Sequence, residues 1–465
     1  MKERLDKAMA AALLAIIAFT ALAHGAVEAW SVALSQALTI LVMLIWASKA
    51  VAERRARINL PSAAFPLAAL VLIGLVQSEF NLSMDVESTR YATAAVFFML
   101  LLFVSAANCL EGRERLLAFS NFVVVFGLSL AVFALAQHFT WNGKIYWVRP
   151  NTQGGTPFGP FVNRNHFAGY MEMIIPVPLA FVALRAARAE ARLFYGFAAA
   201  VMGLALVVSL SRGGMMSLLS SLVFIAAAST WMKARARSER PSPVSRLLHP
   251  ASFMLFVTAA IIAGIIWIGP DPVVKRIAQE IAQDGTAQAG PQAAQASRAV
   301  IWKDTLEMFK AHPLLGVGLG AFATAYPVYG QGNGSIVIAQ AHNDYLQILA
   351  DAGVAGLALA LCFVLLVFRH AARGMRSSDP LVAAVALGSG GGLFALLVHS
   401  LVDFNLQLPS NALMFLLLSA AATHAGTLAK DATLRLVPQN ASSPGARRGG
   451  GDREVAPRYA RGIEQ

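Results

Sequence analysis

The chain alternates long apolar runs with short polar connections over most of its length. A helix that crosses a bilayer needs roughly 20 mostly apolar residues, and it satisfies its own backbone hydrogen bonds in the hydrocarbon core. The pattern therefore predicts an all-α, polytopic transmembrane protein with about twelve spans. We place these spans at residues 8–24, 30–48, 61–78, 91–109, 116–137, 167–184, 193–211, 214–232, 251–269, 353–369, 381–400 and 409–426.

The spans divide the chain into four parts. They are transmembrane helices 1–9 in residues 1–269, a large loop in 270–352, transmembrane helices 10–12 in 353–426 and a tail in 427–465. The tail is rich in Gly, Ser, Pro and Arg and is predicted to be disordered. The first apolar run follows a basic segment, so it is either a cleaved signal peptide or an uncleaved first helix, and the many later spans favour the second.

The loop 270–352 is the largest polar piece of the chain, and we expect it to be partly helical. Loops of this length in compact proteins are usually functional or disordered. The segment from Arg298 to Lys310 is predicted to be an amphipathic helix that ends before Pro313. Its apolar side chains follow helical spacing: Trp302, Leu306 and Phe309.

The charge pattern predicts the orientation of the spans. Hydrophobic residues make up 57% of the chain and charged residues only 13%, which excludes an ordinary soluble domain with roughly 25% charged residues. With the N-terminus in the cytoplasm, alternating spans leave most of the 37 Lys and Arg residues on the cytoplasmic side, as the positive-inside rule requires. The net charge of +12 therefore indicates a lipid bilayer and no nucleic acid as partner, with both termini cytoplasmic.

Nothing in the sequence indicates a metal or a cofactor. The two cysteines, Cys109 and Cys362, lie in or beside apolar runs and form neither a disulfide framework nor a metal-binding spacing. The predicted outer face has no Asp-x-Asp pair and no His/Cys cluster. The glycines from Gly316 to Gly320 lack the strand–turn–helix context of a nucleotide site, so they predict a tight turn.

Four polar motifs from distant parts of the chain fall on the same predicted outer face. Each lies at the end of a span, where the headgroups of the bilayer begin. They are Asn163-Arg-Asn-His166, Ser211-Arg-Gly-Gly214, Ala341-His-Asn-Asp-Tyr345 and His399 to Asn405. This convergence is the main functional signal that the residues themselves give.

Arg212 is the most informative single residue. It lies in a very tight connection between two apolar spans, and charge at membrane depth is costly and tends to mark function. A guanidinium matches phosphate oxygens, and the following Gly pair allows an anion to approach a helix N-terminus. The alternative is an Arg that reaches the interface by snorkelling.

His342 is the candidate general base, since imidazole accepts a proton at neutral pH. Asn343 or Asp344 suits the N-cap of the helix that follows. The alternative is a polar loop histidine beside a cap. His399 and Asp403, four residues apart, are expected to share a helix face and form a supporting pair, or simply to satisfy each other.

Three further residues are candidate ligands for the substrate. Arg298 is one turn before Trp302 and is either a second phosphate contact or a solvated side chain, with Trp302 packing on the membrane surface. Arg164 and His166 precede the sixth span, and Glu172 within that span is a possible partner for them.

The motifs together resemble the O-antigen ligase/polymerase superfamily of bacterial membrane glycosyltransferases. The resemblance covers roughly residues 155–425 in order. The motifs that carry it are Asn163-Arg-Asn-His-Phe-Ala168, Ser211-Arg-Gly-Gly214, Ser297-Arg298 with Trp302, His312-Pro-Leu-Leu-Gly-Val-Gly-Leu-Gly-Ala-Phe322, Ala341-His-Asn-Asp-Tyr-Leu346 with Gly353 and Gly356, and His399-Ser-Leu-Val-Asp-Phe-Asn405.

The resemblance implies an enzyme of the bacterial inner membrane with a periplasmic active site. Its donor would be an undecaprenyl-pyrophosphate-linked glycan, and its acceptor another glycan or lipid A-core. By position, Arg212 and Arg298 would hold the pyrophosphate, with Arg164 and His166 assisting, and His342 would activate the acceptor hydroxyl. The expected reaction is a metal-independent, inverting displacement.

Two other classes of function stay open on the sequence. A twelve-span transporter or flippase for a lipid-linked glycan would carry charges near the bilayer midplane, where Glu172 is the main candidate. A sensor or assembly scaffold would perform no chemistry. Polymerase and ligase activity are not distinguished by the residues.

Overall fold

The computed structural model describes residues 2–54, 59–151, 156–236, 298–330 and 337–436. These residues form an almost wholly helical protein, with one two-stranded antiparallel hairpin of β1 (Lys144–Ile145) and β2 (Arg149–Pro150). The helices are α1 (Lys2–Leu22), α2 (Ala29–Glu53), α3 (Ala64–Glu79), α4 (Val86–Cys109), α5 (Arg113–Phe139), α6 (Arg164–Ile174), α7 (Pro176–Ala183), α8 (Ala189–Val208), α9 (Arg212–Ala236), α13 (Arg298–Ala311), α14 (Phe322–Tyr329), α15 (Asp344–Gly374), α16 (Pro380–His399), the 3₁₀ turn η1 (Asn405–Gln407) and α17 (Pro409–Leu436).

The helices confirm an all-α, polytopic membrane protein. In the described part of the chain, ten helical segments are long and apolar enough to cross a membrane, with α6 and α7 joined as one of them. The third predicted span is the shorter apolar helix α3. The ninth predicted span, 251–269, lies outside the described residues, so the count of about twelve stays a prediction.

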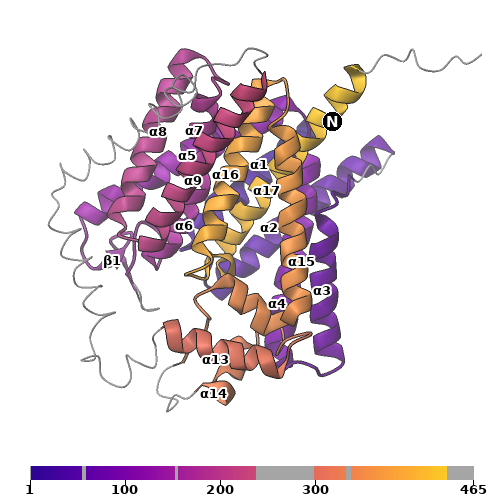
Figure 1. Cartoon of the computed structure of the whole chain (residues 1–465), viewed down its shortest axis with the longest axis vertical. Coiled ribbons are helices and arrows are strands. Elements are labelled where there is room, and N and C mark those ends of the chain that lie inside the picture. Colours follow the sequence, from indigo (N-terminus) through magenta and orange to yellow (C-terminus); the bar gives the residue numbers. More distant parts are fainter. Residues whose placement is uncertain (1, 55–58, 152–155, 237–297, 331–336, 437–465) are drawn as a thin grey trace, which may run out of the picture.

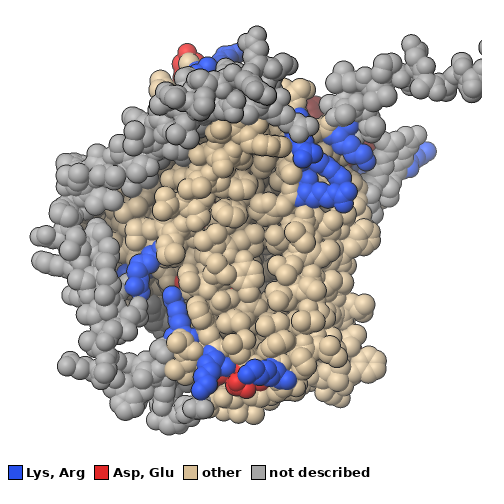
Figure 2. All heavy atoms as spheres, viewed as in Figure 1, with Lys and Arg blue, Asp and Glu red and all other residues tan. Residues whose placement is uncertain are grey.

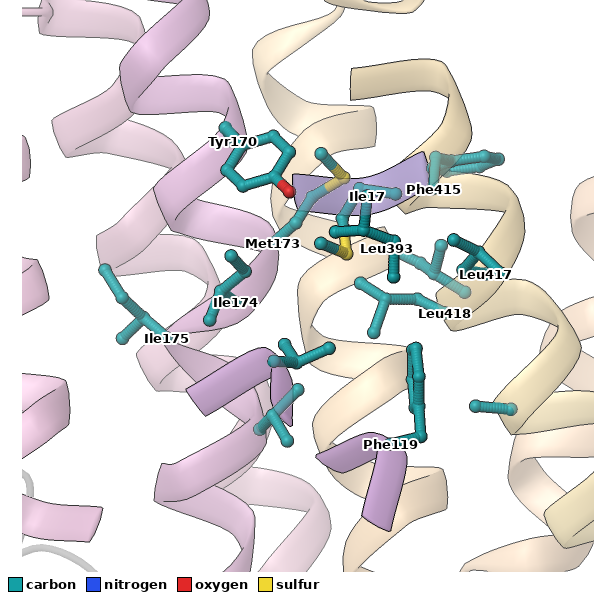
Figure 3. Packing of buried hydrophobic residues seen from close by; sticks show 14 of the residues in the cluster. Ile17, Phe119, Tyr170, Met173, Ile174, Ile175, Leu393, Phe415, Leu417 and Leu418 are labelled. Atoms are coloured by element: carbon teal, nitrogen blue, oxygen red, sulfur yellow. The ribbon is translucent and has the colours of Figure 1, made fainter. Parts of the chain in front are cut away.

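The centre of the bundle is formed by α6, α7, α16 and α17, the most deeply buried of the apolar helices. Side chains from these helices interdigitate with Ile17 of α1 and Phe119 of α5 (Figure 3). The glycines of α16 allow this packing, since a Cβ on Gly392 would collide with the carbonyl oxygen of Met173. These glycines therefore allow close helix packing.

The two ends of the bundle differ. Figure 1 shows α13 and α14 lying across the lower end, whereas the start of α1 and the end of α17 lie at the upper end. In Figure 2, Lys and Arg gather toward the two ends of the visible face, and the broad belt between them is mostly uncharged. This arrangement is the one that a bilayer around the belt requires.

The predicted amphipathic helix is α13, but its buried face is shifted by one position from the prediction. Ile301, Thr305 and Met308 are buried, whereas Leu306 is exposed. Ile301 and Met308 pack with α14 and Ala341 into a small second core. The sequence pattern gave the wrong face because Trp302 and Phe309 are only half-buried and the true face includes the polar Thr305.

The core of α13 and α14 is joined to α15 at a break in that helix. Gly353 has φ +63°, and a Cβ there would collide with the Leu314 backbone. The amides that follow the break donate to carbonyls of the preceding loop, Val354 N–H to Pro313 and Ala355 N–H to Leu314. The residues of α15 at the break are thereby fixed to the loop between α13 and α14.

Candidate functional site

The four polar motifs do converge at one end of the bundle. They occupy the starts of α6, α9 and α15 and the α16–α17 connection, by which we mean residues 400–408. The start of α13 joins them. A helix start is the positive end of the helix dipole, so three such starts around one connection favour a negatively charged group there.

Asp403 lies at the centre of this convergence. Its carboxylate accepts a hydrogen bond from Asn165 Nδ2 at 2.8 Å, and lies 3.9 Å from Arg298 Nη2 and 3.8 Å from His342 Nδ1. The side chain is only 2% exposed. One carboxylate therefore contacts three segments that are far apart in the sequence.

The environment of Asp403 favours its ionised form. Burial alone would raise the pKa of this carboxyl, but interaction with His342, the charges of His399 and His166 and the Phe404 amide outweigh it. The pKa of Asp403 is therefore held below its usual value. An ionised carboxylate beside an imidazole orients the ring.

His342 is accessible although it lies against the buried Asp403. Its side chain is 37% exposed, and its ring packs edge-to-face against Phe404 at 4.9 Å between centroids. The residue has φ +50°, a left-handed conformation that costs energy in a non-glycine residue. Such strain persists where the surroundings impose it, and it is common at functional sites.

Asn343 and Asp344 hold the start of α15 against the α16–α17 connection. Of the two predicted candidates, Asn343 is the N-cap, since its Oδ1 accepts from the Tyr345 and Leu346 amides. Its Nδ2 donates to the Leu401 carbonyl at 2.9 Å. Two further bonds, from Ser400 Oγ and the Leu406 amide, reach the Asp344 carboxylate. These contacts fix His342 next to Asp403.

Trp302 anchors the same loop from the other side. Its indole N–H donates to the Ala341 carbonyl at 3.0 Å, one residue before His342. The packing of the half-buried Trp302 on the membrane surface stays a prediction. Arg298 begins α13 one turn earlier, which brings its guanidinium to Asp403.

Trp302→Phe tests the role of this hydrogen bond. We expect glycan transfer to fall by about threefold to tenfold, because a neutral hydrogen bond contributes about 0.5–1.5 kcal/mol. The measurement is initial transfer rate in membranes at equal protein amount. Trp147→Phe is the matched control, since Trp147 donates a similar bond to Thr140 in the β1–β2 hairpin. Equal losses in the two variants would contradict a role for Trp302 at the site.

Arg212 is the first residue of α9, and its side chain is exposed. Ser211 Oγ accepts from the Gly214 amide at 3.2 Å, so the local sequence caps the helix start. A Cβ on Gly213 would lie 2.5 Å from His399 Nε2 and 3.3 Å from Val402. The first turn of α9 therefore lies directly against the end of α16 and the α16–α17 connection.

The predicted pairing of His399 with Asp403 is wrong. α16 ends at His399, so Asp403 lies beyond the helix and the two side chains do not share a helix face. His399 Nδ1 instead lies 3.0 and 3.1 Å from the two carboxylate oxygens of Glu172 on α6. Glu172, expected to pair with Arg164 or His166, is therefore the partner of His399.

Arg164 and His166 lie in the first turn of α6. Arg164 is half-buried, and its amide donates to the Thr156 carbonyl. His166 is 4% exposed and packs against Phe404 at 5.0 Å, so Phe404 contacts both His166 and His342. Neither ring nitrogen of His166 has a hydrogen-bond partner among the described residues.

Two residues of this arrangement were not predicted as site residues: Asn165 and Phe404. Both are inside recognised motifs, but neither is charged, so the sequence pattern did not distinguish them. Within the described ranges, no group of three or more His, Cys, Asp or Glu side chains has an arrangement suited to a metal ion.

Comparison with known families agrees with the motifs. The model of the O-antigen ligase family matches residues 197–361. No curated protein matches the chain. The matched segment contains Arg212, Arg298 and the start of α15 with His342, and it ends before His399 and Asp403. The match confirms the resemblance to the O-antigen ligase/polymerase superfamily.

Proposed function

We propose that this protein, a membrane protein with the domain of the O-antigen ligase family, transfers a glycan from an undecaprenyl-pyrophosphate carrier to an acceptor hydroxyl. The acceptor is a second lipid-linked glycan or a lipid A-core. The reaction takes place at the periplasmic face of the bacterial inner membrane, at the end of the bundle that carries α13 and α14 (Figure 1).

The observation that carries this proposal is the set of contacts around Asp403. A transferase of this kind needs a base for the acceptor and cations for the departing pyrophosphate. Asp403 contacts one of each, His342 at 3.8 Å and Arg298 at 3.9 Å. The exposure of both side chains, 37% and 44%, leaves them accessible to a substrate.

The chemical step is a single inverting displacement at the anomeric carbon of the donor. His342 removes the proton of the acceptor hydroxyl while the oxygen bonds to the anomeric carbon. The bond from that carbon to the phosphate oxygen breaks, and its electron pair stays on the undecaprenyl pyrophosphate. Arg212 and Arg298, with Arg164 nearby, neutralise the negative charge that develops there, so neither a general acid nor a metal is needed.

Arg298→Ala tests the pyrophosphate contact. We expect the KM for the lipid-linked donor to rise by about tenfold to a hundredfold, because a charge-assisted contact to phosphate is lost. Lys310→Ala, at the other end of α13 and paired with Glu307 on the surface, is the matched control and should leave the KM unchanged. A donor KM that is equal in the two variants would contradict the proposed contact.

The proposed function is tested with the purified protein in vesicles that contain a lipid-linked glycan donor and an acceptor. We expect transfer of the glycan with release of undecaprenyl pyrophosphate. The rival transporter would move the donor across the vesicle bilayer without forming a new glycosidic bond. Movement without transfer would therefore replace the proposed function by the transporter, and neither activity would favour a scaffold.

A further inference from the structure

The bundle contains a buried acid–imidazole pair that the displacement step does not use. Glu172 is fully buried on α6, and His399, at the end of α16, is 1% exposed. Ionisable groups within transmembrane helices are costly and are usually retained for function. Neither residue is within the segment that matches the O-antigen ligase family.

The pair fixes the orientation of the His399 ring. Both carboxylate oxygens of Glu172 lie within 3.1 Å of Nδ1, so Nδ1–H donates to the carboxylate. Because Nδ1 is held by Glu172, the opposite edge of the imidazole ring must point away from α6. The opposite edge, Nε2 and Cδ2, faces the first turn of α9 at Gly213.

Gly213 is in close contact with that edge. A Cβ at this position would lie 2.5 Å from His399 Nε2 and 2.6 Å from Cδ2, closer than any side chain tolerates. The backbone of α9 thus rests directly on a ring that Glu172 holds rigidly. Arg212 is the residue immediately before Gly213, so the position and orientation of its backbone depend on the same contact.

The local sequence does not determine this placement by itself. Ser211 caps α9 and so determines where the helix begins. A cap cannot determine where the helix lies relative to Asp403 and His342, which belong to other segments. The imidazole of His399 supplies that tertiary contact, four residues before Asp403 in the sequence.

We propose that Glu172 and His399 are positioning residues that set Arg212, through Gly213, at the correct distance for the donor pyrophosphate. The proposal rests on the proposed function, since it assigns to Arg212 a contact with that group. Arg212 touches the substrate, whereas Glu172 and His399 act through the backbone of α9. Their loss affects donor binding more than the chemical step.

A double-mutant cycle tests this inference. Gly213→Ala pushes α9 away from the ring, and we expect it to raise the donor KM by about fivefold to thirtyfold with kcat changed much less. His399→Ala removes the ring and should raise the donor KM by a similar factor. In the double variant, the methyl group added by Gly213→Ala has space. Adding Gly213→Ala to His399→Ala should therefore leave the donor KM unchanged or partly restore it.

Gly214→Ala is the matched control. Its Cβ would meet the Cβ of Ala168 at 2.6 Å, and the next nearest atoms belong to Ser211. Gly214→Ala disturbs the same turn of α9 by another contact. The factors by which Gly214→Ala and His399→Ala raise the donor KM should therefore multiply in the double variant. Glu172→Gln should raise the donor KM in the same direction as His399→Ala, because it weakens the hold on the ring.

If the factors by which Gly213→Ala and His399→Ala raise the donor KM multiply in the double variant, the inference is overturned. Equal losses in kcat and in donor affinity would overturn it as well. The proposed function is judged separately by Arg212→Ala in the wild-type background. Wild-type transfer by Arg212→Ala would remove the pyrophosphate contact itself. An inactive Arg212→Ala together with multiplying effects in the cycle would leave that contact standing and reject only the positioning pair. Folding is checked for each variant by its elution as a monodisperse detergent complex.

Discussion

Replacing His342 by Asn is expected to lower kcat for glycan transfer by about 10²–10⁴-fold, the usual contribution of a general base. Asn accepts the left-handed backbone at φ +50° better than most residues, so the α15 start should stay folded. The donor KM should change little, because the imidazole acts on the acceptor. The measurement is steady-state transfer with donor and acceptor varied separately.

The matched control for this substitution is His312→Asn. His312 lies in the same α13–α14 unit and contacts the Tyr329 hydroxyl at 2.9 Å, away from Asp403. It should retain nearly full kcat. A His342→Asn protein with wild-type kcat would rule out the base, and the mechanism would then need another proton acceptor among the residues near the site.

The sequence predicted the helices well because hydropathy acts locally. An apolar run that is long enough to span a bilayer can be recognised from its own residues, whatever helices it packs against. The N-cap at Asn343 and the tight turn at Gly316 were predicted for the same reason, since caps and turns depend on a few neighbouring residues.

Partners in tertiary contacts could not be predicted in this way. His399 and Asp403 are four residues apart, which predicted a shared helix face, but α16 ends between them. Glu172 is 227 residues from His399 in sequence, and no local pattern indicates their contact. The buried face of α13 was wrong for a related reason, because its core is completed by α14 and Ala341.

The motifs nevertheless predicted that the site would form, because topology limits where they can lie. Alternating spans bring every second connection to the same face of a membrane. Arg212, Arg298 and His342 were expected together on that basis, and the contacts of Gly213 and of Asp403 bring their segments to one connection. What the spans do not determine is which side chain organises the others.

Asp403→Asn is expected to lower transfer by about 10²-fold or more, because it disturbs three segments at once. An amide has one acceptor oxygen where the carboxylate has two, so its Nδ2 would face either Asn165 Nδ2 or the Phe404 amide, both of which are donors. The negative charge beside Arg298 and His342 is lost as well. Both kcat and the donor KM should change, unlike the effect of His342→Asn.

The pH dependence of this variant distinguishes the effect of losing the charge of Asp403 from a general loss of stability. Because the pKa of Asp403 is below its usual value, the wild-type carboxylate is ionised at neutral and mildly acidic pH, and its stabilising effect is lost only as pH falls through that lowered value. The difference in melting temperature between wild type and Asp403→Asn should therefore persist from about pH 5 to 8 and disappear only at lower pH. Asp379→Asn is the control, since Asp379 caps the other end of α16 and pairs with Arg113. It should leave transfer intact, and a comparable loss there would mean that α16 stability, and not the charge of Asp403, explains the effect.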